Sequence, residues 1–225
     1  MARGNGATKG SFETIDLQTV RIGVVGTSPL LVHRFSEKSA REMLEKMMGI
    51  PNSGREKREP DLDYVRSAYI AAPGVFGFPA GAFKCAMVRS AKQTKGLTMT
   101  DARSAYRVQA DDPVTGLVRI YGVPELDYAA ARVGQGGMDL RFRLRLEPWC
   151  CSFDVTFNAR AMTVEQIVQA VESGGFGSGV GDWRQEKGGD HGAFRYGQPE
   201  EVRAIESAAK KPTAAPITSI RNGSM

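Results

Sequence analysis

Residues 139–146 read Asp-Leu-Arg-Phe-Arg-Leu-Arg-Leu, so apolar and basic side chains alternate along most of this stretch. Successive side chains of a β-strand point to opposite faces of a sheet. The alternation therefore predicts a strand with Leu and Phe on one face and Arg141, Arg143 and Arg145 on the other. Residues 152–158 (Ser-Phe-Asp-Val-Thr-Phe-Asn) predict another strand, whose apolar residues again share one face. The chain is thus expected to build a sheet with at least one apolar face.

The segments around these strands predict a mixture of strands and helices. We expect further strands at 19–25, 30–32, 64–70, 75–78 and 117–121, and helices from about 36 to 48 and from 79 to about 94, with Gly96 placed to stop the second helix. Thr163 and Gln166 form a capping-box pattern that begins a third helix. Gly174 and Gly175 are expected to end it after about Glu172, before a last strand. Because the strands cluster in hairpins, this order favours an α+β fold with a ferredoxin-like, RNA-recognition-type core.

Length and composition indicate one folded domain. The chain has 225 residues, of which 41% are hydrophobic and 24% are charged, and this suits a single core. Residues 1–10 are small and polar and predict a disordered arm, while residues 207–225 predict a flexible tail. Residues 11–206 then form the domain, with a mixed-charge insertion near 50–63 that we expect to be mobile.

The sequence also excludes several classes of protein. No apolar run approaches the roughly 18 to 20 residues of a membrane-spanning helix, and the N-terminal residues lack the apolar stretch of a secretory signal. Three cysteines, two of them adjacent, cannot form a disulfide framework, so we expect a reduced, cytoplasmic location. Without a Cys-x-x-Cys or a Walker motif, we expect no metal and no other cofactor. Without a long apolar run, we also expect no membrane partner.

Glycine makes up 26 of the 225 residues, well above the usual share of about 7%, and it gathers in the segment 175–192. This segment reads Gly-Phe-Gly-Ser-Gly-Val-Gly-Asp-Trp-Arg-Gln-Glu-Lys-Gly-Gly-Asp-His-Gly. It follows a helix instead of a strand, so a dinucleotide-binding loop is rejected. Glycines such as Gly177, Gly179 and Gly181 free backbone N–H groups to approach a phosphate closely.

The same segment carries an aromatic side chain and two cations. Trp183 is able to stack on a base, and Arg184 and Lys187 supply positive charge, which together favour a nucleic-acid contact. The alternative is a surface hairpin whose glycines only make turns, with Trp183 packed into the core.

Two further basic groups are candidates for the same role. The three arginines of 139–146 lie about 6.6 to 6.8 Å apart along a strand and would form a stripe that follows phosphates. The alternative is a solvated face with surface ion pairs. In the helix that starts at 79, Phe83, Met87 and Ala91 form an apolar stripe for the core. Lys84, Lys92 and Lys95 lie together on another side, either as a solvated face or as a nucleic-acid contact.

A histidine and the cysteines complete the candidate groups. His33 and Arg34 flank a turn and are able to act on RNA as a base and a phosphate clamp, although a structural histidine is the alternative. Cys85, Cys150 and Cys151 have no activating partner in the sequence and are interpreted as small apolar fillers.

Two motifs resemble a known family. Residues 78–89 (Phe-Pro-Ala-Gly-Ala-Phe-Lys-Cys-Ala-Met-Val-Arg) resemble the P-G-S-S-x-K-G-x-x-R helix of the RAMP superfamily, the CRISPR-associated backbone proteins built on a modified RNA-recognition fold. Residues 177–184 (Gly-Ser-Gly-Val-Gly-Asp-Trp-Arg) are similar to the C-terminal glycine-rich loop of that superfamily. The positions that match are Lys84 and Arg89 in the helix and Gly177, Gly179, Gly181 and Arg184 in the loop.

The sequence departs from the family pattern in three respects. Residues 80–82 read Ala-Gly-Ala where the family has its glycine-serine pair, and Cys85 stands where glycine is usual. No aspartate follows the first strand, where the RNA-cleaving backbone subunits place one, which argues against nuclease activity. The whole chain also resembles uncharacterised proteins encoded by bacteriophages and prophages, for which the location would be the host cytoplasm.

These observations favour a non-catalytic nucleic-acid-binding protein. We expect it to coat single-stranded RNA or DNA as a repeating oligomer, so that its partners are the strand and copies of itself. It would serve as a CRISPR-like backbone subunit or as a phage single-strand binding or annealing protein. The net charge of +5 permits this function without demanding it. The alternatives are a RAMP-type RNA endonuclease that uses His33, and a structural or interaction component of a phage assembly.

Overall fold

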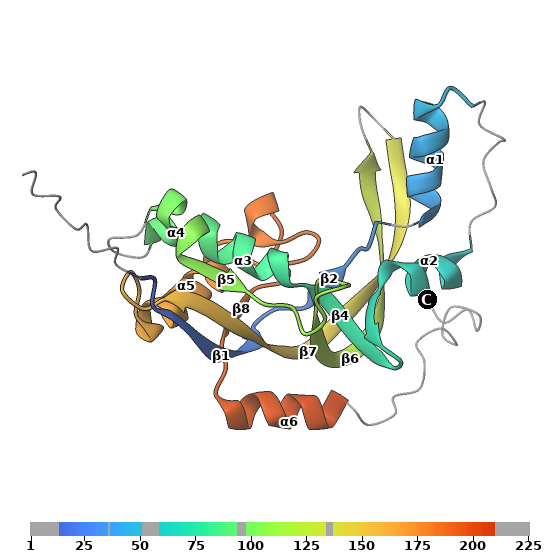
Figure 1. Cartoon of the computed structure of the whole chain (residues 1–225). Helices are drawn as coiled ribbons and strands as arrows, with labels where there is room; N and C mark the ends of the chain where they lie inside the picture. The colour runs from blue at the N-terminus through green and yellow to red at the C-terminus, as the bar shows by residue number, and fades with distance from the viewer. Residues whose placement is uncertain (1–13, 36, 51–58, 94–97, 134–136, 210–225) are drawn as a thin grey trace, which may run out of the picture.

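The computed structural model describes residues 14–35, 37–50, 59–93, 98–133 and 137–209, which form a mixed α+β fold (Figure 1). Its α-helices within these residues are α1 (Glu37–Met47), α2 (Pro60–Ser67), α3 (Ala80–Arg89), α4 (Met99–Ala105), α5 (Val164–Gly177) and α6 (Pro199–Ala209), with short 3-10 turns η1 (Ala91–Gln93) and η2 (Gln185–Lys187). Its strands are β1 (Leu17–Gly26), β2 (Leu30–Val32), β3 (Tyr69–Ala72), β4 (Val75–Pro79), β5 (Tyr106–Val108), β6 (Leu117–Val133), β7 (Gly137–Asn158) and β8 (Phe194–Tyr196).

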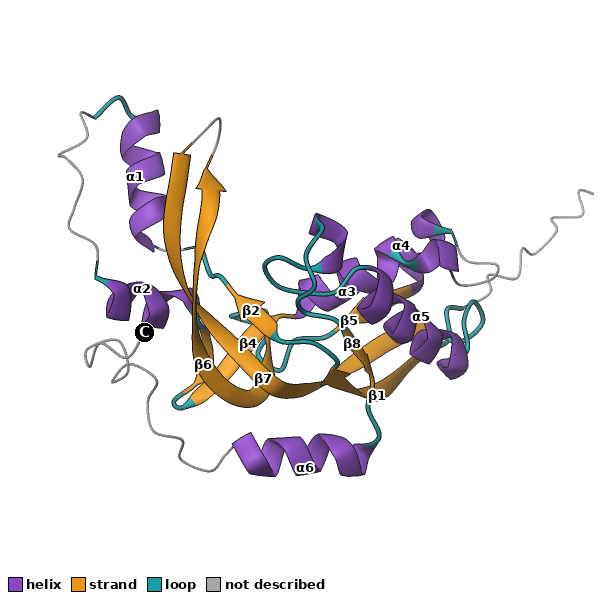
Figure 2. Ribbon diagram, turned by 180° about the vertical axis from the view of Figure 1, so that it is seen from behind, coloured by secondary structure: helices purple, strands orange, loops and turns teal. Residues whose placement is uncertain are grey.

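The strands that the structure describes form one antiparallel sheet around β7. Its main path runs β3-β4-β6-β7-β1-β8, and β2 and β5 also pair with β7. Figures 1 and 2 show α3, α4 and α5 on one side of the sheet and α6 on the other. The sheet therefore has a helical layer on one face and a single helix across the opposite face.

The core lies between the sheet and the layer of α3 and α5. Opposite residues of an antiparallel pair share a face, and the register sets Ile22 of β1 opposite Phe153 of β7. The Phe83 ring on α3 packs against Phe153 with ring centroids 5.0 Å apart and against Phe194 of β8 at 5.6 Å. The predicted apolar stripe of this helix is confirmed, because Phe83, Met87 and Ala91 are all fully buried.

Beyond this layered part, β6 and β7 continue as a long two-stranded hairpin that projects away from the helical layer (Figure 2). The stretch 139–146 lies in this hairpin and is a strand, as its alternation predicts. It is not separate from 152–158, however, because β7 runs without a break from Gly137 to Asn158, through a cis peptide bond between Glu147 and Pro148.

The predicted strand at 64–70 is wrong. Residues 64–67 are the C-terminal half of α2, and only the end of that stretch is extended, in β3. Pro60 at the start of the helix and acidic residues in its first turn favour this helix over a strand. Ser67 fixes the helix on β7, because its hydroxyl donates to the Tyr64 carbonyl (2.6 Å) and accepts from the Leu144 N–H (2.8 Å).

The predicted end of the third helix is also wrong. The capping box of Thr163 and Gln166 is present, but α5 passes through both glycines and ends at Gly177. A Cβ on Gly174 would lie 2.9 Å from the Met87 nitrogen, and one on Gly175 would lie 1.9 Å from the Phe194 carbonyl oxygen. The glycines therefore let α5 approach α3 and β8 closely, and they do not terminate the helix.

Several remaining predictions differ in extent. The helix from 79 ends at Arg89 and is followed by η1, and Lys95 and Gly96 lie outside the described residues. The helices α4 and α6 and the strand β5 were not predicted, and α6 continues to Ala209, so the tail expected from 207 begins too early. The expected arm at 1–10 and most of the expected insertion near 50–63 lie outside the described residues, although residues 60–63 begin α2. None of the described helices is long and apolar enough to cross a membrane.

Candidate nucleic-acid interface

The glycine-rich loop after α5, residues 178–192, is held against β2 and the residue before it by backbone hydrogen bonds. The Asp182 N–H donates to the Leu31 carbonyl at 2.9 Å, and the Gly192 N–H donates to the Pro29 carbonyl at 2.7 Å. The loop also closes on itself, since the Val180 N–H donates to the Gly192 carbonyl at 2.9 Å. Gly192 has a φ of 69°, and a Cβ there would lie 1.7 Å from the Val180 carbonyl oxygen, so only glycine fits. The loop is thus a defined structure on β2.

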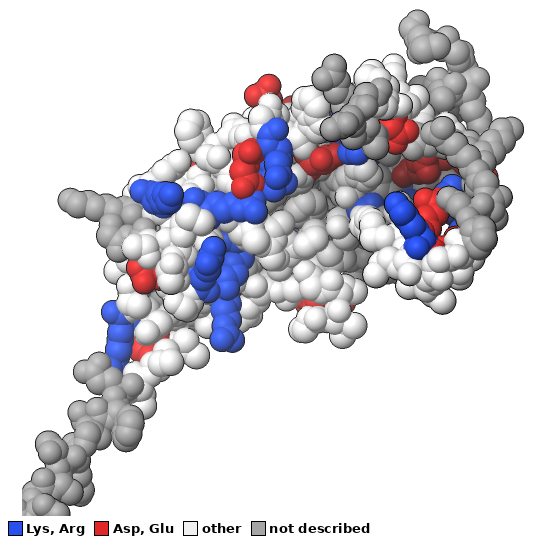
Figure 3. Space-filling model, turned by 90° about the horizontal axis from the view of Figure 1, so that it is seen from above, with Lys and Arg blue, Asp and Glu red and all other residues white. Residues whose placement is uncertain are grey.

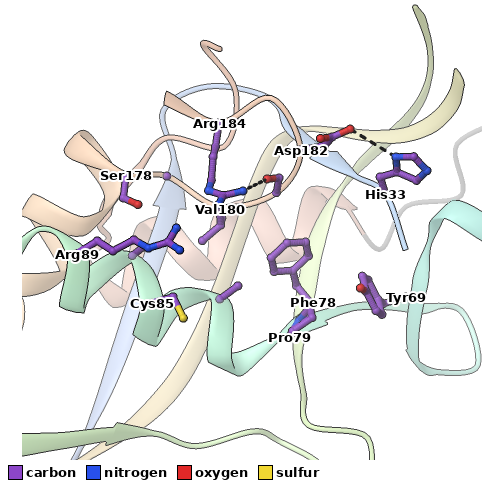
Figure 4. Close-up of a pocket in the computed structure, with 14 residues that line it drawn as sticks. His33, Tyr69, Phe78, Pro79, Cys85, Arg89, Ser178, Val180, Asp182 and Arg184 are labelled. Carbon is purple, nitrogen blue, oxygen red and sulfur yellow. Dashed lines mark hydrogen bonds and ion pairs between the residues drawn. The ribbon is translucent and has the colours of Figure 1, made fainter. Parts of the chain in front are cut away.

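Between this loop and α3 lies a pocket of about 440 Å³ (Figure 4). In Figure 4 the Arg89 and Arg184 guanidinium groups lie at one end, His33 and Asp182 at the other, and Phe78 between them. The lining residues are His33, Tyr69, Phe78, Pro79, Ala82, Cys85, Ala86, Arg89, Ser178, Gly179, Val180, Gly181, Asp182 and Arg184. The helix motif and the loop motif, far apart in the sequence, therefore form the two walls of one pocket.

One carboxylate bridges the two guanidinium groups. Glu186 on η2 accepts from Arg184 Nε at 3.0 Å and Nη2 at 2.9 Å, and it also accepts a short hydrogen bond from Arg89 Nη1. Arg184 Nη1 donates in addition to the Gly181 carbonyl at 3.2 Å. The loop is thereby tied to the C-terminal end of α3, and this end of the pocket keeps an excess of positive charge.

At the other end, the Asp182 carboxylate lies close to two arginines and a histidine. Its Oδ2 lies 2.8 Å from Arg143 Nη1, 3.5 Å from His33 Nδ1 and 3.7 Å from Arg141 Nη1. The hydrogen bond from His33, reinforced by the bond and charge of Arg143, holds the pKa of Asp182 well below its ordinary value, although partial burial opposes this. The Asp182 carboxylate is therefore ionised across the physiological range and fixes the position of His33.

The three arginines of the hairpin are engaged in ion pairs, as in the alternative interpretation, but Arg143 does not lie on a solvated face. Arg143 is 3% exposed and lies between Asp182 and Asp127, the residue opposite it on β6. Arg145 pairs with Glu125 and Glu147, both through short contacts. The Arg143 guanidinium is thus buried between two carboxylates and is not open to a phosphate from solvent.

Other cations on the helical side carry no such partners. Lys84, Lys92 and Lys187 make no side-chain hydrogen bond or ion pair with any residue that the structure describes, and neither does Arg103 on α4. Their elements are adjacent, because α3 contacts η1 and α4, and the Arg89–Glu186 pair joins α3 to η2. Figure 3 shows Lys and Arg gathered on this face with few carboxylates among them, whereas both signs are interleaved toward the hairpin at the right.

Trp183 lies on the surface of the loop. It is 54% exposed, so the alternative that it packs into the core is wrong; the core tryptophan is Trp149, whose indole N–H donates to the Ser28 carbonyl at 2.8 Å. The Trp183 backbone has a φ of 52°, in the left-handed region that residues other than glycine rarely adopt. The loop thus holds a large aromatic ring in solvent at a backbone conformation that is costly for tryptophan.

The remaining predicted residues lie around the same pocket or beside it. Gly179 and Gly181 line the pocket, and Gly177 is the last residue of α5. Arg34 follows His33 and pairs with Glu37 at 3.6 Å. Cys85 is exposed and lines the pocket, so its interpretation as an apolar filler is wrong, whereas Cys150 and Cys151 are buried as expected. Within the described residues, no group of three or more His, Cys, Asp or Glu side chains is placed to hold a metal ion.

Sequence reasoning did not identify several pocket residues. Asp182 and Glu186 pair with arginines at the two ends of the pocket, Ser178 lines it, and Tyr69 and Phe78 supply its aromatic side. Ser178, Asp182 and Phe78 stand inside the two motifs, so the sequence marks their segments but not their roles. Tyr69 is brought to the site by the position of β3, which no local pattern shows.

Comparisons with known proteins bear on the fold. The sequence matches no protein-family model and no curated protein. The structure is similar to that of Cmr6. That crystal structure, from Pyrococcus furiosus, aligns with a TM-score of 0.38 and 13% sequence identity, and the match covers 81% of this chain and 98% of that chain.

Proposed function

We propose that the chain binds single-stranded nucleic acid, RNA or DNA, without cutting it, on the face formed by α3, η1 and the loop 178–192. One observation carries this proposal: Lys84, Lys92 and Lys187 have no side-chain partner among the described residues, and the loop that holds Lys187 and the exposed Trp183 is joined to α3 by the Arg89–Glu186 pair. Proteins that bind single strands without sequence preference combine a positively charged track with aromatic rings on which bases stack. The strand follows the lysines with its phosphates, and Trp183 stacks on a base.

The strand order supports an RNA-recognition-type, RAMP-like core. In chain order β1, α3, β6, β7, α5 and β8 form a β-α-β-β-α-β unit, and in the sheet the four strands lie in the order β8-β1-β7-β6. This is the connectivity of ferredoxin-like folds. RNA-recognition motifs bind bases on the sheet face away from the helices. Here α6 crosses that face, in contact with β1, β6 and β7, so the strand binds on the side of α3 and the loop instead.

We further propose that copies of the chain bind side by side along one strand. A protein that contacts mainly phosphates has no preferred sequence, so that neighbouring sites on the strand are equivalent. The result is a repeating oligomer whose length follows the length of the strand, and its partners are the nucleic acid and copies of itself.

Binding is tested by fluorescence anisotropy with a labelled strand of about 30 nucleotides at several salt concentrations. Affinity is expected to fall steeply with salt, and each of Lys84→Glu, Lys92→Glu and Lys187→Glu is expected to lower the log–log slope by about 0.7. Lys46→Glu on the exposed face of α1 is the matched control and is expected to leave the slope unchanged. Binding that does not respond to salt, or lysine variants that behave like the control, would overturn the proposal.

A second candidate function, cleavage of RNA, is favoured by the contact between His33 and Asp182. The Asp182 carboxylate orients His33 at the edge of the pocket, and Arg89 and Arg184 are placed to hold a phosphate at its other end. In such a site His33 takes the proton of a ribose 2′-hydroxyl while the 2′-oxygen attacks the adjacent phosphorus. The bond from phosphorus to the 5′-oxygen of the next nucleotide breaks, and that oxygen takes a proton from water, which leaves a 2′,3′-cyclic phosphate and a 5′-hydroxyl. Labelled RNA incubated with wild-type protein and with His33→Ala separates the two functions. Cleavage that requires both His33 and the 2′-hydroxyl supports the second candidate, and intact RNA in both samples removes it.

A further inference from the structure

The pocket between α3 and the loop has properties that a strand-following surface does not need. Ser178 lines this pocket and is 2% exposed, and its buried hydroxyl has no hydrogen-bond partner in the described structure. Buried hydroxyl groups are nearly always paired, so an unpaired one in the wall of a pocket indicates that a ligand atom completes it. Tyr69 and Phe78 form an aromatic side, in edge-to-face contact with centroids 6.0 Å apart.

We propose that this pocket takes one nucleobase turned out of the bound strand, and that the phosphate of that nucleotide binds between Arg89 and Arg184. This inference rests on the proposed function and assigns the pocket its ligand: a nucleobase joined to a phosphate. Its volume of about 440 Å³ lies within the usual range for small-molecule sites, about 300 to 1,000 Å³. The combination of aromatic rings, a hydroxyl and an imidazole matches a base, which has both a π-face and polar edges.

The arrangement of Glu186 supports the phosphate position. A carboxylate that bridges two guanidinium groups occupies the place that a phosphate takes in the same geometry. A phosphodiester carries one negative charge, as the carboxylate does, so the exchange leaves the net charge of the site unchanged. Glu186 is on the surface, on the short turn η2, and its side chain is free to move into solvent when the phosphate enters.

The polar groups at the pocket do not select one base. The Ser178 hydroxyl both donates and accepts, and an imidazole nitrogen of His33 accepts or donates according to its protonation. Each therefore pairs with the edge of any nucleobase. The pocket is expected to hold a base of any type, as a non-specific strand-binding protein requires.

Cys85 provides the test, because it is the exposed thiol in the pocket wall while Cys150 and Cys151 are buried. The rate of its reaction with a thiol-specific disulfide reagent is measured on the wild-type protein, alone and with a saturating strand of about 12 nucleotides. A strand of equal length and charge made of abasic units is the control. We expect the normal strand to slow the reaction about tenfold or more and the abasic strand to change it less than about twofold, since only the former carries a base to cover the thiol.

The outcomes separate this inference from the proposed function. If both strands bind and slow the thiol equally, or if neither slows it, the pocket holds no base, although the strand-binding function stands. If neither strand binds by anisotropy, the proposed function itself fails. Free adenosine monophosphate at millimolar concentration forms a further arm. Protection by the free nucleotide without protection by the strand would show a site for a soluble nucleotide and overturn the inference.

Discussion

Arg143 and Asp182 join the projecting hairpin to the glycine-rich loop through a hydrogen bond of 2.8 Å. Asp127, across the ladder on β6, accepts from Arg143 Nε at the same distance, so one guanidinium connects two carboxylates from distant parts of the chain. The arginine is buried and Asp182 is partly buried. The loop that forms one wall of the pocket is therefore positioned by an arginine of the sheet as well as by its own backbone.

Replacing Arg143 tests this connection. Arg143→Ala leaves two carboxylates near each other without their shared cation, and we expect the free energy of unfolding to fall by about 3 kcal/mol. Arg145→Ala is the matched control, because its pairs with Glu125 and Glu147 lie on the surface, and a loss below about 1 kcal/mol is expected. Urea unfolding followed by circular dichroism measures both. Equal losses in the two variants would contradict the role given to Arg143.

The lowered pKa of Asp182 predicts how stability depends on pH. A carboxyl group whose pKa is lower in the folded state than in the unfolded state, about 3.9, stabilises the fold fully above about pH 5. This contribution is lost as the pH falls through about 4 toward the folded-state pKa. Asp182→Asn is therefore expected to be less stable than wild type at neutral pH, and the difference is expected to shrink in acid. A difference that is constant from about pH 3 to 7 would show that this ionisation contributes nothing.

The alternation at 139–146 correctly gives the strand and the faces of its side chains, but it does not show what those side chains contact. The partners Glu125 and Asp127 alternate around Leu126 in the same manner, and pairing the two stretches in a hairpin would have placed these acids opposite Arg145 and Arg143. That signal exists in the sequence only when both strands and their register are considered together. The net charge of this face depends on the acids of β6 as well as on the arginines of β7, so the arginines alone do not predict it.

The pocket depends even more on tertiary contacts. The motif containing Lys84 and Arg89 and the loop containing Arg184 are both visible in the sequence as basic, small-residue segments. Their meeting depends on β2 as the surface onto which the loop folds and on Glu186 as the link to α3. Neither link has a periodicity or a motif of its own. The sequence therefore shows the two segments that form the walls of the pocket, but it does not show that they meet or which ion pairs join them.

The glycines of α5 offer a test of packing. Gly175→Ala places a methyl group 1.9 Å from the Phe194 carbonyl oxygen, so either α5 or β8 must shift, and we expect a loss of about 3 kcal/mol in the free energy of unfolding. Gly81→Ala in the first turn of α3 is the control, because its methyl group meets no atom within 4 Å. The control is expected to be neutral or to stabilise the protein by about 0.5 to 1 kcal/mol. Thermal unfolding measures the stability of both variants. A Gly175→Ala protein as stable as wild type would contradict the packing described.

Trp183 is expected to contribute directly to binding of the strand. Removing the ring in Trp183→Ala loses one stacking contact, for which about 1 to 3 kcal/mol is typical, and affinity for the labelled strand should fall about tenfold. Tyr128→Ala removes another exposed aromatic ring, on the hairpin, and is expected to bind as wild type does. Because Trp149 is buried, quenching of tryptophan fluorescence by the strand should be lost in the Trp183 variant alone. Equal binding by both variants would exclude stacking on Trp183.

Glu186 is expected to weaken binding in the wild-type protein, because it competes with phosphate for Arg89 and Arg184. Glu186→Gln removes its charge while keeping its size, so both guanidinium groups become available and affinity for the strand is expected to rise about three- to tenfold at low salt. The slope of affinity against salt should change little, since the same phosphate binds between the two arginines in both proteins. Glu200→Gln on α6 makes the same change of charge on the opposite side of the sheet, and it is expected to leave both quantities unchanged. A Glu186→Gln protein that binds no more tightly than Glu200→Gln would show that the two arginines do not meet the strand.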